Sequence, residues 1–455
     1  MKKTNRRQFL ETSKRTTLAM ATGLTLLRDA GSVSAAPAND KIVMAIIGCR
    51  SRGPGLARNF ARRPDCEMAY LCDVDTQMYE KHHKMIADAQ GGKDPKFEQD
   101  FRRMLEDKSV DAIIVATPTH WHAPATIWGC QAGKDVFVEK PVCHNVWEGL
   151  KMIEAARKYK RVVQVGTQNR SAPYNMAARK YIADGKLGKV HYIRVLNQKF
   201  WSNFKPRPDQ PVPAGLDWDM WNGPAPEAGY NFNLRYNWHH LWRYCIGDLG
   251  NDGAHQFDQA RMIAGFGLPK KAYCTGGRWN TEGMADTPDT QIATFTYDND
   301  MVATLELTLY TPYMLKIDPV VRNTDMFPYW PQCATRIEIY GDQGVMTVGR
   351  MGGGWQVFVR TKDRKPVVKE QCYGRFPDAP HQQNWVDCIR SREKPNADIE
   401  IGITSHNTLH YATMSYRIGG VGLNIDPVTK QVDNPEAMKL FKREYRKPWV
   451  IGEEV

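Results

Sequence analysis

The sequence predicts an α/β fold in two parts, a parallel sheet covered by helices followed by an α/β domain with an antiparallel sheet. Two observations support this prediction. From residue 41 to about residue 165, short continuous apolar runs alternate with stretches of helical periodicity, which is typical of a parallel sheet covered on both faces. After Gly166 the apolar residues alternate with polar ones, which is typical of antiparallel strands that have one solvated face.

Five apolar runs mark the strands expected in the first part. Each run is short and is followed by residues with helical spacing, so strand and helix alternate along the chain. The runs read IVMAIIG, CEMAYLCDVD, DAIIVATP, KDVFVEKP and VVQVG, and the expected helices span residues 54–62, 99–106, 123–132 and 146–159.

The second part combines alternating strands with a few helices. Residues 201–242 are rich in aromatic residues, proline and glycine, so we expect a long loop that forms a wall of a ligand site. Helices are expected at 258–263, 381–389 and 405–419, and strands within HYIRVLNQKFW, KAYCTGGRWN, QIATFTYDND, MVATLELTLY, RIEIYGDQGVMTVG and WQVFVRT.

The composition is that of a globular protein of two or three domains. The chain has 455 residues, of which 42% are hydrophobic and 25% charged. No apolar run approaches the roughly 18 residues that a membrane span needs, so we expect no span in the mature chain. The ten cysteines are scattered singly without a CxxC pair, which argues against a zinc site and predicts few or no disulfides.

The first 36 residues have the features of an export signal. NRRQFL at residues 5–10 resembles a twin-arginine motif, residues 16–27 are mildly apolar, and Val33-Ser34-Ala35 offers a cleavage site. We therefore expect recognition by the twin-arginine export machinery and a periplasmic or other extracytoplasmic location. The alternative is a cytoplasmic protein with a basic, frayed N-terminus.

The signal also accounts for part of the positive charge. Residues 1–36 carry seven basic and two acidic residues, so their removal lowers the formal net charge from +12 to +7. The remaining chain has no block of five or more Lys or Arg residues. This mild charge does not predict a nucleic-acid partner.

A glycine turn follows the first apolar run. Residues 48–53 read GCRSRG, which departs from the full GxGxxG pattern, but they lie between an expected strand and an expected helix. Asp73, 25 residues after Gly48, stands where a carboxylate can accept hydrogen bonds from a ribose, while the helix N-terminus binds a pyrophosphate. The segment predicts NAD binding, and Arg50 and Arg52 leave NADP open. The alternative is an ordinary strand–helix turn.

Two further motifs end strands at the same sheet edge. TPTHWH at residues 117–122 follows the run DAIIVATP, and Glu139-Lys140-Pro141 ends the run KDVFVEKP. For His120 we favour a structural role in a capped turn, whereas His122 is a candidate for the cofactor site. A lysine beside a cofactor can orient a substrate hydroxyl and offset developing negative charge. Lys140 alone would otherwise be interpreted as a solvated lysine.

The richest cluster is GDLGNDGAHQFD at residues 247–258. Its glycines lead into a helix and place His255 near the first turn, where a group that titrates near pH 6–7 can accept a proton from an alcohol. Asp258 lies three residues later on the same helical face and can orient the imidazole. The alternative is a capping segment with a structural His–Asp pair.

Other residues have weaker signals. His239 and His240 with His255 and Asp252 lack the regular spacing of a metal site, so we expect no metal. Aromatic faces suit sugar rings, but packing in a core explains the same density equally well. This applies to the tryptophans at positions 201, 218, 221, 238 and 242.

With these motifs, and with VGTQNR at residues 165–170, the chain resembles the Gfo/Idh/MocA oxidoreductase family, in particular its twin-arginine-exported branch. The resemblance covers nearly everything after residue 40. It implies a Rossmann domain at 37–165 after a signal peptide at 1–36, and an α/β domain with an open antiparallel sheet at 166–455 for substrate binding and oligomerisation. A homodimer or homotetramer is therefore expected.

The resemblance also implies roles for particular residues. The lysine of the family's EKP motif falls on Lys140 and its catalytic histidine on His255, while the aspartate usual four positions before that histidine is replaced by Asn251, with Asp252 next to it. On the substrate side we expect Arg170, His239, His240 and Asp258. Cofactor contacts are expected from Gly48, Arg50, Ser51, Arg52, Gly53, Asp73, Thr117, Pro118, His122, Glu139 and Lys140.

The resemblance implies a nicotinamide-dependent oxidoreductase that acts on a hydroxyl group of a sugar, polyol or glycoside. If the enzyme works outside the cytoplasm, we expect NAD to be a tightly bound cofactor. Two alternatives remain. One is an NAD-dependent glycosidase that works by transient oxidation and elimination, although such relatives tend to lack the EKP lysine. The other is a non-catalytic sugar-binding protein that has kept its cofactor.

Overall fold

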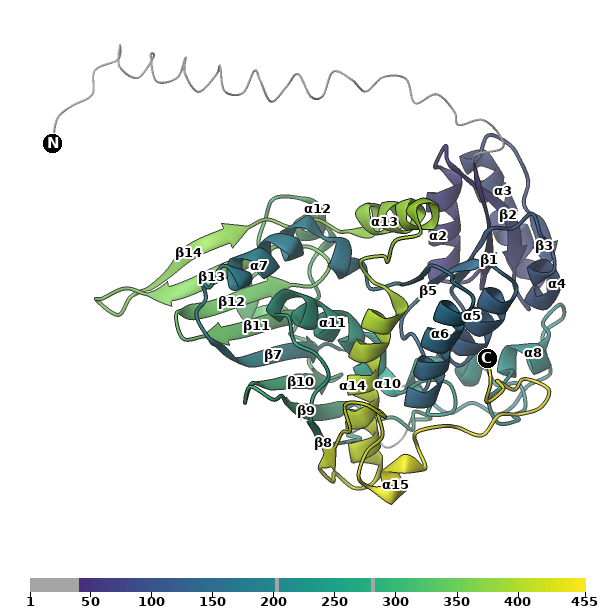
Figure 1. The fold of residues 1–455 in the computed structure, drawn as a ribbon. Helices are drawn as coiled ribbons and strands as arrows, with labels where there is room; N and C mark the ends of the chain where they lie inside the picture. Colours follow the sequence, from purple (N-terminus) through teal and green to yellow (C-terminus); the bar gives the residue numbers. More distant parts are fainter. Residues whose placement is uncertain (1–40, 201–203, 280–282) are drawn as a thin grey trace, which may run out of the picture.

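The N-terminal domain is built on a six-stranded parallel sheet, as the apolar runs predicted. The structure is a computed structural model that describes residues 41–200, 204–279 and 283–455, so the twin-arginine motif and Trp201 lie outside the described residues. The strand order is β3-β2-β1-β4-β5-β6, in which the order reverses beside β1 (Figure 1). The strands are β1 Ile42–Ile47, β2 Cys66–Cys72, β3 Lys96–Glu98, β4 Ala112–Val115, β5 Asp135–Val138 and β6 Val163–Val165.

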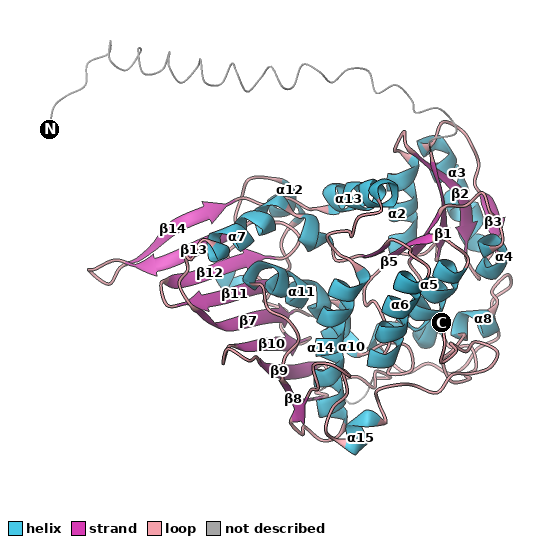
Figure 2. Cartoon of the chain, in the orientation of Figure 1, coloured by secondary structure: helices cyan, strands magenta, loops and turns pink. Residues whose placement is uncertain are grey.

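Helices cover both faces of this sheet, as continuous apolar strands require (Figure 2). On one face lie α2 (Arg52–Ala61), α3 (Gln77–Ala89) and α13 (Asp378–Ser391). On the other lie α4 (Phe101–Leu105), α5 (His122–Gln131) and α6 (Val146–Lys158). The four helices expected from the first part are found within two residues of their predicted bounds, whereas α3 and β3 were not predicted.

The C-terminal domain is an α/β domain with a nine-stranded sheet. Its order is β14-β13-β12-β11-β7-β10-β9-β8-β15, and every adjacent pair is antiparallel except β7 and β10, which run parallel. The sheet is therefore mixed, because a long crossover through helices and two strands connects β7 to β10. The strands are β7 Val190–Gln198, β8 Lys271–Gly277, β9 Thr290–Thr296, β10 Val302–Thr308, β11 Arg336–Gly341, β12 Gly344–Gly349, β13 Trp355–Arg360, β14 Pro366–Cys372 and β15 Leu423–Asn424.

Three helices pack on one face of the nine-stranded sheet: α7 (Pro173–Ala183), α11 (Gly253–Ala264) and α14 (Ile399–Arg417) (Figure 2). Buried positions alternate with more exposed ones along β8, β9 and β10, as the sequence pattern predicted. The expected loop at 201–242 contains, in its described part, the short helices α8 (Trp218–Asn222) and α9 (Phe232–Tyr236) and an aromatic cluster of its own.

Segments from the end of the chain complete the first domain. The ring of Trp385 in α13 is fully buried against Phe60 and Phe137, with ring centroids 5.5 Å apart in each case. Trp449 and Val455 belong to the core on the opposite face of the parallel sheet. The sheets thus divide near residue 165, but α13 and the C-terminal tail pack on the N-terminal domain.

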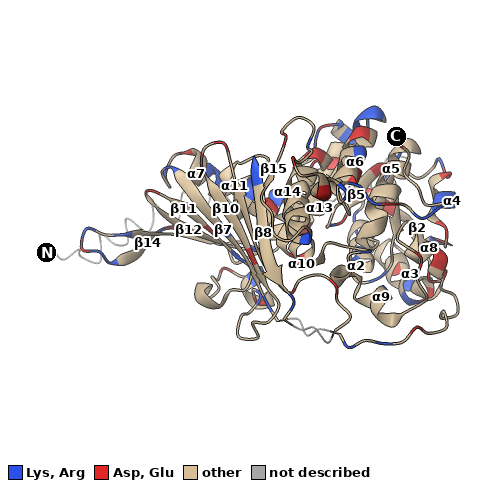
Figure 3. Ribbon diagram, turned by 90° about the horizontal axis from the view of Figure 1, so that it is seen from below, with Lys and Arg blue, Asp and Glu red and all other residues tan. Residues whose placement is uncertain are grey.

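Charged residues and cysteines are distributed over both domains. In Figure 3 the basic and acidic segments are interspersed over the helices and the strand ends. All ten cysteines are free thiols, and nine of them are buried. None of the helices in the described ranges is both long and apolar enough to cross a bilayer.

Candidate active site

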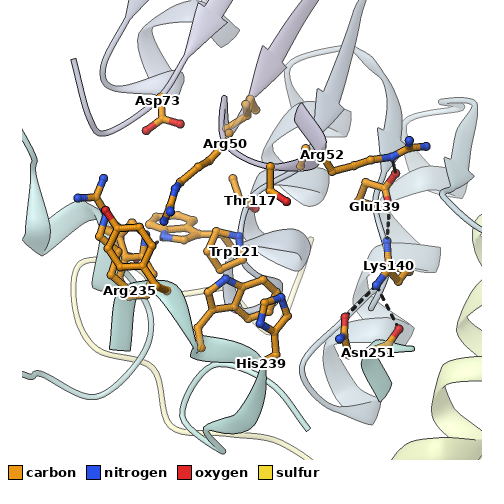
Figure 4. Close-up of a pocket in the computed structure, with 18 of the residues that line it drawn as sticks. Arg50, Arg52, Asp73, Thr117, Trp121, Glu139, Lys140, Arg235, His239 and Asn251 are labelled. Carbon is orange, nitrogen blue, oxygen red and sulfur yellow. Dashed lines mark hydrogen bonds and ion pairs between the residues drawn. The ribbon is translucent and has the colours of Figure 1, made fainter. Parts of the chain in front are cut away.

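A cavity of about 530 Å³ opens at the carboxyl ends of β1, β2, β4 and β5 and is closed by residues of the second domain (Figure 4). This volume is in the range of small-molecule sites. The first domain contributes the turn after β1, Asp73, Thr117, Pro118, Glu139 and Lys140. The second domain contributes residues from α9, α10 (Gly247–Asn251), α11, α12 (Pro319–Asn323) and the turn after β12.

Two glycines make the turn after β1 possible. Gly48 has a φ of +94°, and a Cβ there would lie 2.7 Å from the carbonyl oxygen of Ala116. A Cβ on Gly53 would lie 1.9 Å from the carbonyl oxygen of Gly48, so only glycine lets α2 begin so close to β1. Arg50, where the full motif has a glycine, does not adopt a positive φ. The N-terminus of α2 is therefore exposed to the cavity, where it can bind a pyrophosphate.

Asp73 lies at the end of β2 with its carboxylate fixed by the backbone. Its two oxygens accept hydrogen bonds from the N–H groups of Cys49 (2.7 Å) and Asp75 (3.0 Å). Burial raises the pKa of Asp73 to about 6, although these two hydrogen bonds oppose the shift. Each carboxylate oxygen keeps a lone pair for a further donor, as ribose binding requires.

Arg50 and Arg235 border the same end of the cavity. The guanidinium of Arg50 lies 3.6 Å from the centre of the Tyr236 ring, a close cation–π contact, and Arg235 is paired with buried Asp75. Arg50 thus covers the region beside Asp73 (Figure 4).

Arg52 is held by two carboxylates. It donates to Glu139 at 2.9 Å and forms a two-pronged contact with Asp378 at 2.8 Å, which joins α2 to the end of β5 and to α13. Burial alone would lower the pKa of Arg52, but Glu139 and Asp378 raise it above its ordinary value. Glu139 lines the cavity mainly as the partner of Arg52. Gly53 and His122 are not lining residues.

The two histidines of TPTHWH are structural in this arrangement. His120 is fully buried and its Nε2 lies 2.9 Å from the carbonyl oxygen of Trp221, which agrees with the role expected for it. His122 lies between the carbonyl oxygens of Thr117 (2.8 Å) and Pro141 (2.6 Å), so it connects the loops after β4 and β5. His122 therefore supports the cofactor loops from behind.

Lys140 points into the cavity and is oriented by Asn251 (Figure 4). Its Nζ donates to the side-chain oxygen of Asn251 at 2.8 Å and to the backbone oxygen of Asn251 at 3.2 Å. The amide nitrogen of Asn251 donates in turn to Asp248 at 3.1 Å. Burial lowers the pKa of Lys140, an effect that Asp252 opposes and Arg350 reinforces. One ammonium hydrogen remains for a ligand.

Asp252 lies behind the cavity in a network of cations. Its carboxylate accepts from Lys199 at 2.5 Å, Lys316 at 2.8 Å and Arg350 at 3.0 Å. Burial alone would raise the pKa of Asp252, but these cations hold it well below its ordinary value. Asp252 therefore acts as a fixed negative charge among cations, while Asn251 is the residue that contacts Lys140.

His255 is the third residue of α11 and lines the cavity. Its Nδ1 is buried and has no hydrogen-bond partner among the described residues. Burial, followed by Arg350 and Lys140, lowers the pKa of His255 well below its ordinary value, so the imidazole is neutral at pH 7. A neutral imidazole has one unprotonated ring nitrogen, which can accept a proton.

The other residues assigned to the substrate side are placed differently. Asp258 does not orient His255, because its carboxylate binds Arg170 at 2.8 Å and the hydroxyl of Ser405 at 2.5 Å. Asp258, Arg170 and His240 are not among the residues that line the cavity. His239 does line it, stacked on Trp238 with ring centroids 3.8 Å apart, and burial lowers its pKa to about 3.

Some of the tryptophans pack in a core and some line the cavity. Trp218 and Trp221 stack at 4.7 Å in a buried aromatic cluster, while Trp221 and Trp238 also line the cavity. Within the described ranges, no group of three His, Cys, Asp or Glu side chains is arranged to hold a metal ion.

Sequence reasoning missed several lining residues of the second domain. These are Tyr236, Arg322, Arg350, Met351 and Phe376. The run Met351-Gly352-Gly353-Gly354 was a usable signal, because three successive glycines between two expected strands indicate an unusual backbone. All four of these residues have positive φ, between 53° and 115°.

Sequence comparison matches the chain to two consecutive domain families. Residues 42–167 match "Oxidoreductase family, NAD-binding Rossmann fold" and residues 175–347 match "GFO/IDH/MocA C-terminal domain". The uncharacterized oxidoreductase YrbE of Bacillus subtilis is 24% identical over 58% of this chain and 67% of its own length. A glycosyl hydrolase family 109 protein of Stenotrophomonas maltophilia is 30% identical over 39% of this chain and 41% of its own length.

Solved structures show the same fold. Levoglucosan dehydrogenase in complex with NADH and levoglucosan aligns with a TM-score of 0.62 at 18% identity, covering 84% of this chain and 99% of that one. The cavity described above fits such a dinucleotide: Gly48 and Gly53 expose the start of α2, and Asp73 keeps acceptor capacity at the end of β2.

Proposed function

Because the chain belongs to the Gfo/Idh/MocA family of NAD-binding oxidoreductases, we propose that it transfers hydride between a carbohydrate hydroxyl group and NAD. The observation that supports this most is the placement of Lys140 and His255. A cation with a free donor hydrogen and a neutral imidazole line one cavity next to the dinucleotide turn. This pair matches what alcohol oxidation needs.

The proposed chemistry follows from these two side chains. Lys140, held by Asn251, donates its remaining hydrogen to the substrate oxygen and stabilises the negative charge that develops there. His255 accepts the hydroxyl proton as the carbonyl group forms, and the resulting imidazolium releases it to solvent. NAD, held by the glycine turn after β1 and by Asp73, would supply the hydride acceptor for the carbon that carries this hydroxyl group, so the two electrons and the proton would leave by separate routes. Reduction of a carbonyl group is the reverse.

The proposal is tested by following NADH formation with purified protein, NAD and a panel of neutral and acidic sugars. Lys140→Met keeps the length of the side chain and removes its charge. We expect the rate of the hydride step to fall about 100-fold or more, with circular dichroism unchanged. Lys180→Met, on the solvent side of α7, is the matched control. Near-normal single-turnover reduction by Lys140→Met would refute the assigned role.

A second candidate is an NAD-dependent glycosidase, favoured by the similarity to proteins named glycosyl hydrolase family 109. That reaction removes hydride, eliminates the aglycone and returns the hydride, so glycoside cleavage would occur without net NADH. The presence of Lys140 favours the dehydrogenase. The same assay with p-nitrophenyl glycosides distinguishes the two, and binding of sugars without either product would indicate a non-catalytic binding protein.

We also propose that residues 1–36 direct twin-arginine export and that the mature protein is a homo-oligomer. The motif at Arg6-Arg7 and the cleavage site near Ala35 support export. Replacing both arginines with lysine should leave the protein in the cytoplasmic fraction, and an unchanged distribution would contradict the proposal. Light scattering on the purified protein tests whether it is a homo-oligomer, and a monomeric mass would exclude this.

A further inference from the structure

The substrate side of the cavity carries more positive charge than its carboxylates and the proposed reaction account for. Arg322 and Arg350 both line it, together with Lys140. Among the residues that line the cavity the carboxylates are Asp73 and Glu139, and both belong to the cofactor side. Glu139 is paired with Arg52, and Asp73 is placed for the ribose. Lys140, Arg322 and Arg350 therefore face a part of the cavity that is lined by no carboxylate of the described residues.

The carboxylates behind this region do not balance it. Asp252 is shared by Lys199, Lys316 and Arg350, and Asp248 accepts from Lys199 at 2.9 Å. Arg322 forms no ion pair within the described residues; its guanidinium donates to the sulfur of Met351 at 3.7 Å and lies 5.3 Å from the centre of the Phe376 ring. The Nε atoms of Arg322 and Arg350 are both buried without a partner in the described part of the chain.

The backbone fixes the two arginines relative to each other. Arg350 follows β12 directly, and the turn that continues from it approaches α12 so closely that a Cβ on Gly352 would lie 2.9 Å from the Cα of Arg322. The N–H of Phe376 donates to the carbonyl oxygen of Arg322 at 3.0 Å. Two guanidinium groups are thus held in one wall of the cavity, and of these only Arg350 is paired with a carboxylate among the residues that the structure describes, so the charge of Arg322 costs free energy unless an anion is bound.

We propose that the substrate is an acidic carbohydrate, a uronic acid or its glycoside, whose carboxylate is bound by Arg322 and Arg350. The inference rests on the proposed function, because it names the substrate class of the same site. A guanidinium matches a carboxylate in shape and can donate two parallel hydrogen bonds. The pyrophosphate of the cofactor would be held elsewhere, at the α2 N-terminus on the first domain, where Gly48 and Gly53 expose the start of the helix.

A substrate carboxylate bound by Arg322 and Arg350 would also raise the basicity of His255. Arg350 is one of the groups that lower the pKa of His255, after burial. A bound anion offsets that charge, so the pKa of His255 rises when the acidic substrate binds and the imidazole becomes a stronger base. An acidic sugar should therefore show the acid limb of its kcat profile at a higher pH than a neutral sugar.

The test compares matched acidic and neutral sugars in wild-type protein and in Arg322→Met. The pairs are D-glucuronate with D-glucose and D-galacturonate with D-galactose, with D-glucose 6-phosphate as a second anion. Arg322→Met should lower kcat/KM for the uronates about 10- to 150-fold more than for the matched neutral sugars, mostly through KM. Arg322→Lys should restore part of the loss. Arg375→Met, at an exposed arginine of a neighbouring segment, is the control.

Binding is measured separately, by titrating NADH-loaded protein with D-glucuronate and following tryptophan fluorescence. If no sugar is oxidised but D-glucuronate binds and Arg322→Met weakens it, the anion site stands and the proposed function fails. If neutral sugars are oxidised at least as well as the uronates, the function stands and the inference is overturned. Preference for D-glucose 6-phosphate, equal losses with acidic and neutral sugars, or no binding of either uronate would also overturn it.

Discussion

The pKa of Asp73 predicts how NADH binding depends on pH. Burial raises that pKa to about 6 in the free protein, whereas burial lowers the pKa of the lining residue His239 to about 3 and that of His255 well below its ordinary value. Ribose hydroxyls that donate to the ionised carboxylate lower its pKa in the complex. Protons and NADH therefore compete for Asp73 between about pH 5 and 7.

The size of the effect follows from the shift. At pH 5 a group with a pKa of about 6 is roughly nine-tenths protonated, so the Kd for NADH should be about tenfold higher at pH 5 than at pH 7.5. Asp73→Asn cannot ionise and should show a flat profile over this range. At pH 7.5 the substitution should weaken NADH binding by about 1–3 kcal/mol, because it removes an acceptor from the ribose.

The measurement is a titration with NADH at pH 5.0, 6.0 and 7.5 at constant ionic strength, followed by tryptophan fluorescence. Asp94→Asn removes an exposed carboxylate of the same domain and is the control. A wild-type Kd that does not change with pH, or the same slope in Asp73→Asn, would refute the reasoning. The effect on the free protein has the opposite sign: because the folded-state pKa is raised, ionisation of Asp73 reduces stability as the pH rises from about 4 to above 6.

Two further predictions concern the base and the core. His255→Ala should lower turnover about 10²- to 10⁴-fold and remove the acid limb of the kcat/KM profile. Because burial, Arg350 and Lys140 lower the pKa of His255, this limb should lie below the pH 6–7 expected for an ordinary histidine. An unchanged profile would assign the base to another residue. Trp385→Ala should reduce the free energy of unfolding by about 3–5 kcal/mol in urea titrations, whereas Trp279→Ala, at a ring that is 78% exposed, should change it by less than about 0.5 kcal/mol; equal effects would contradict the packing described here.

The sequence allowed prediction of those parts of the site that local spacing determines. A glycine turn between a strand and a helix, followed by an acidic strand end, needs only one βαβ unit, and both sheets followed from the period of their apolar residues. The pairing of Lys140 with Asn251 joins residues 111 positions apart, so no local pattern could reveal it. The parallel pairing of β7 with β10 is long-range for the same reason.

Asp258 illustrates why helical spacing alone was misleading. Residues three apart do share a face of α11, but Arg170 is buried on the same side and needs a carboxylate more strongly than a neutral imidazole does. Arg322 and Arg350 were missed because each is an isolated arginine, and their meaning depends on the turn that brings them together.

The return of α13 and the C-terminal tail to the first domain has a consequence for biosynthesis. The strands of the parallel sheet leave the ribosome early, but Trp385, which covers Phe60 and Phe137, emerges only after every strand of the second sheet except β15 has been made. Until then one apolar face of the nascent sheet is incompletely covered, a condition in which chaperones bind. The domain that is translated first is therefore among the last parts of the molecule to be finished, and a messenger truncated before codon 385 yields a sheet whose core cannot close.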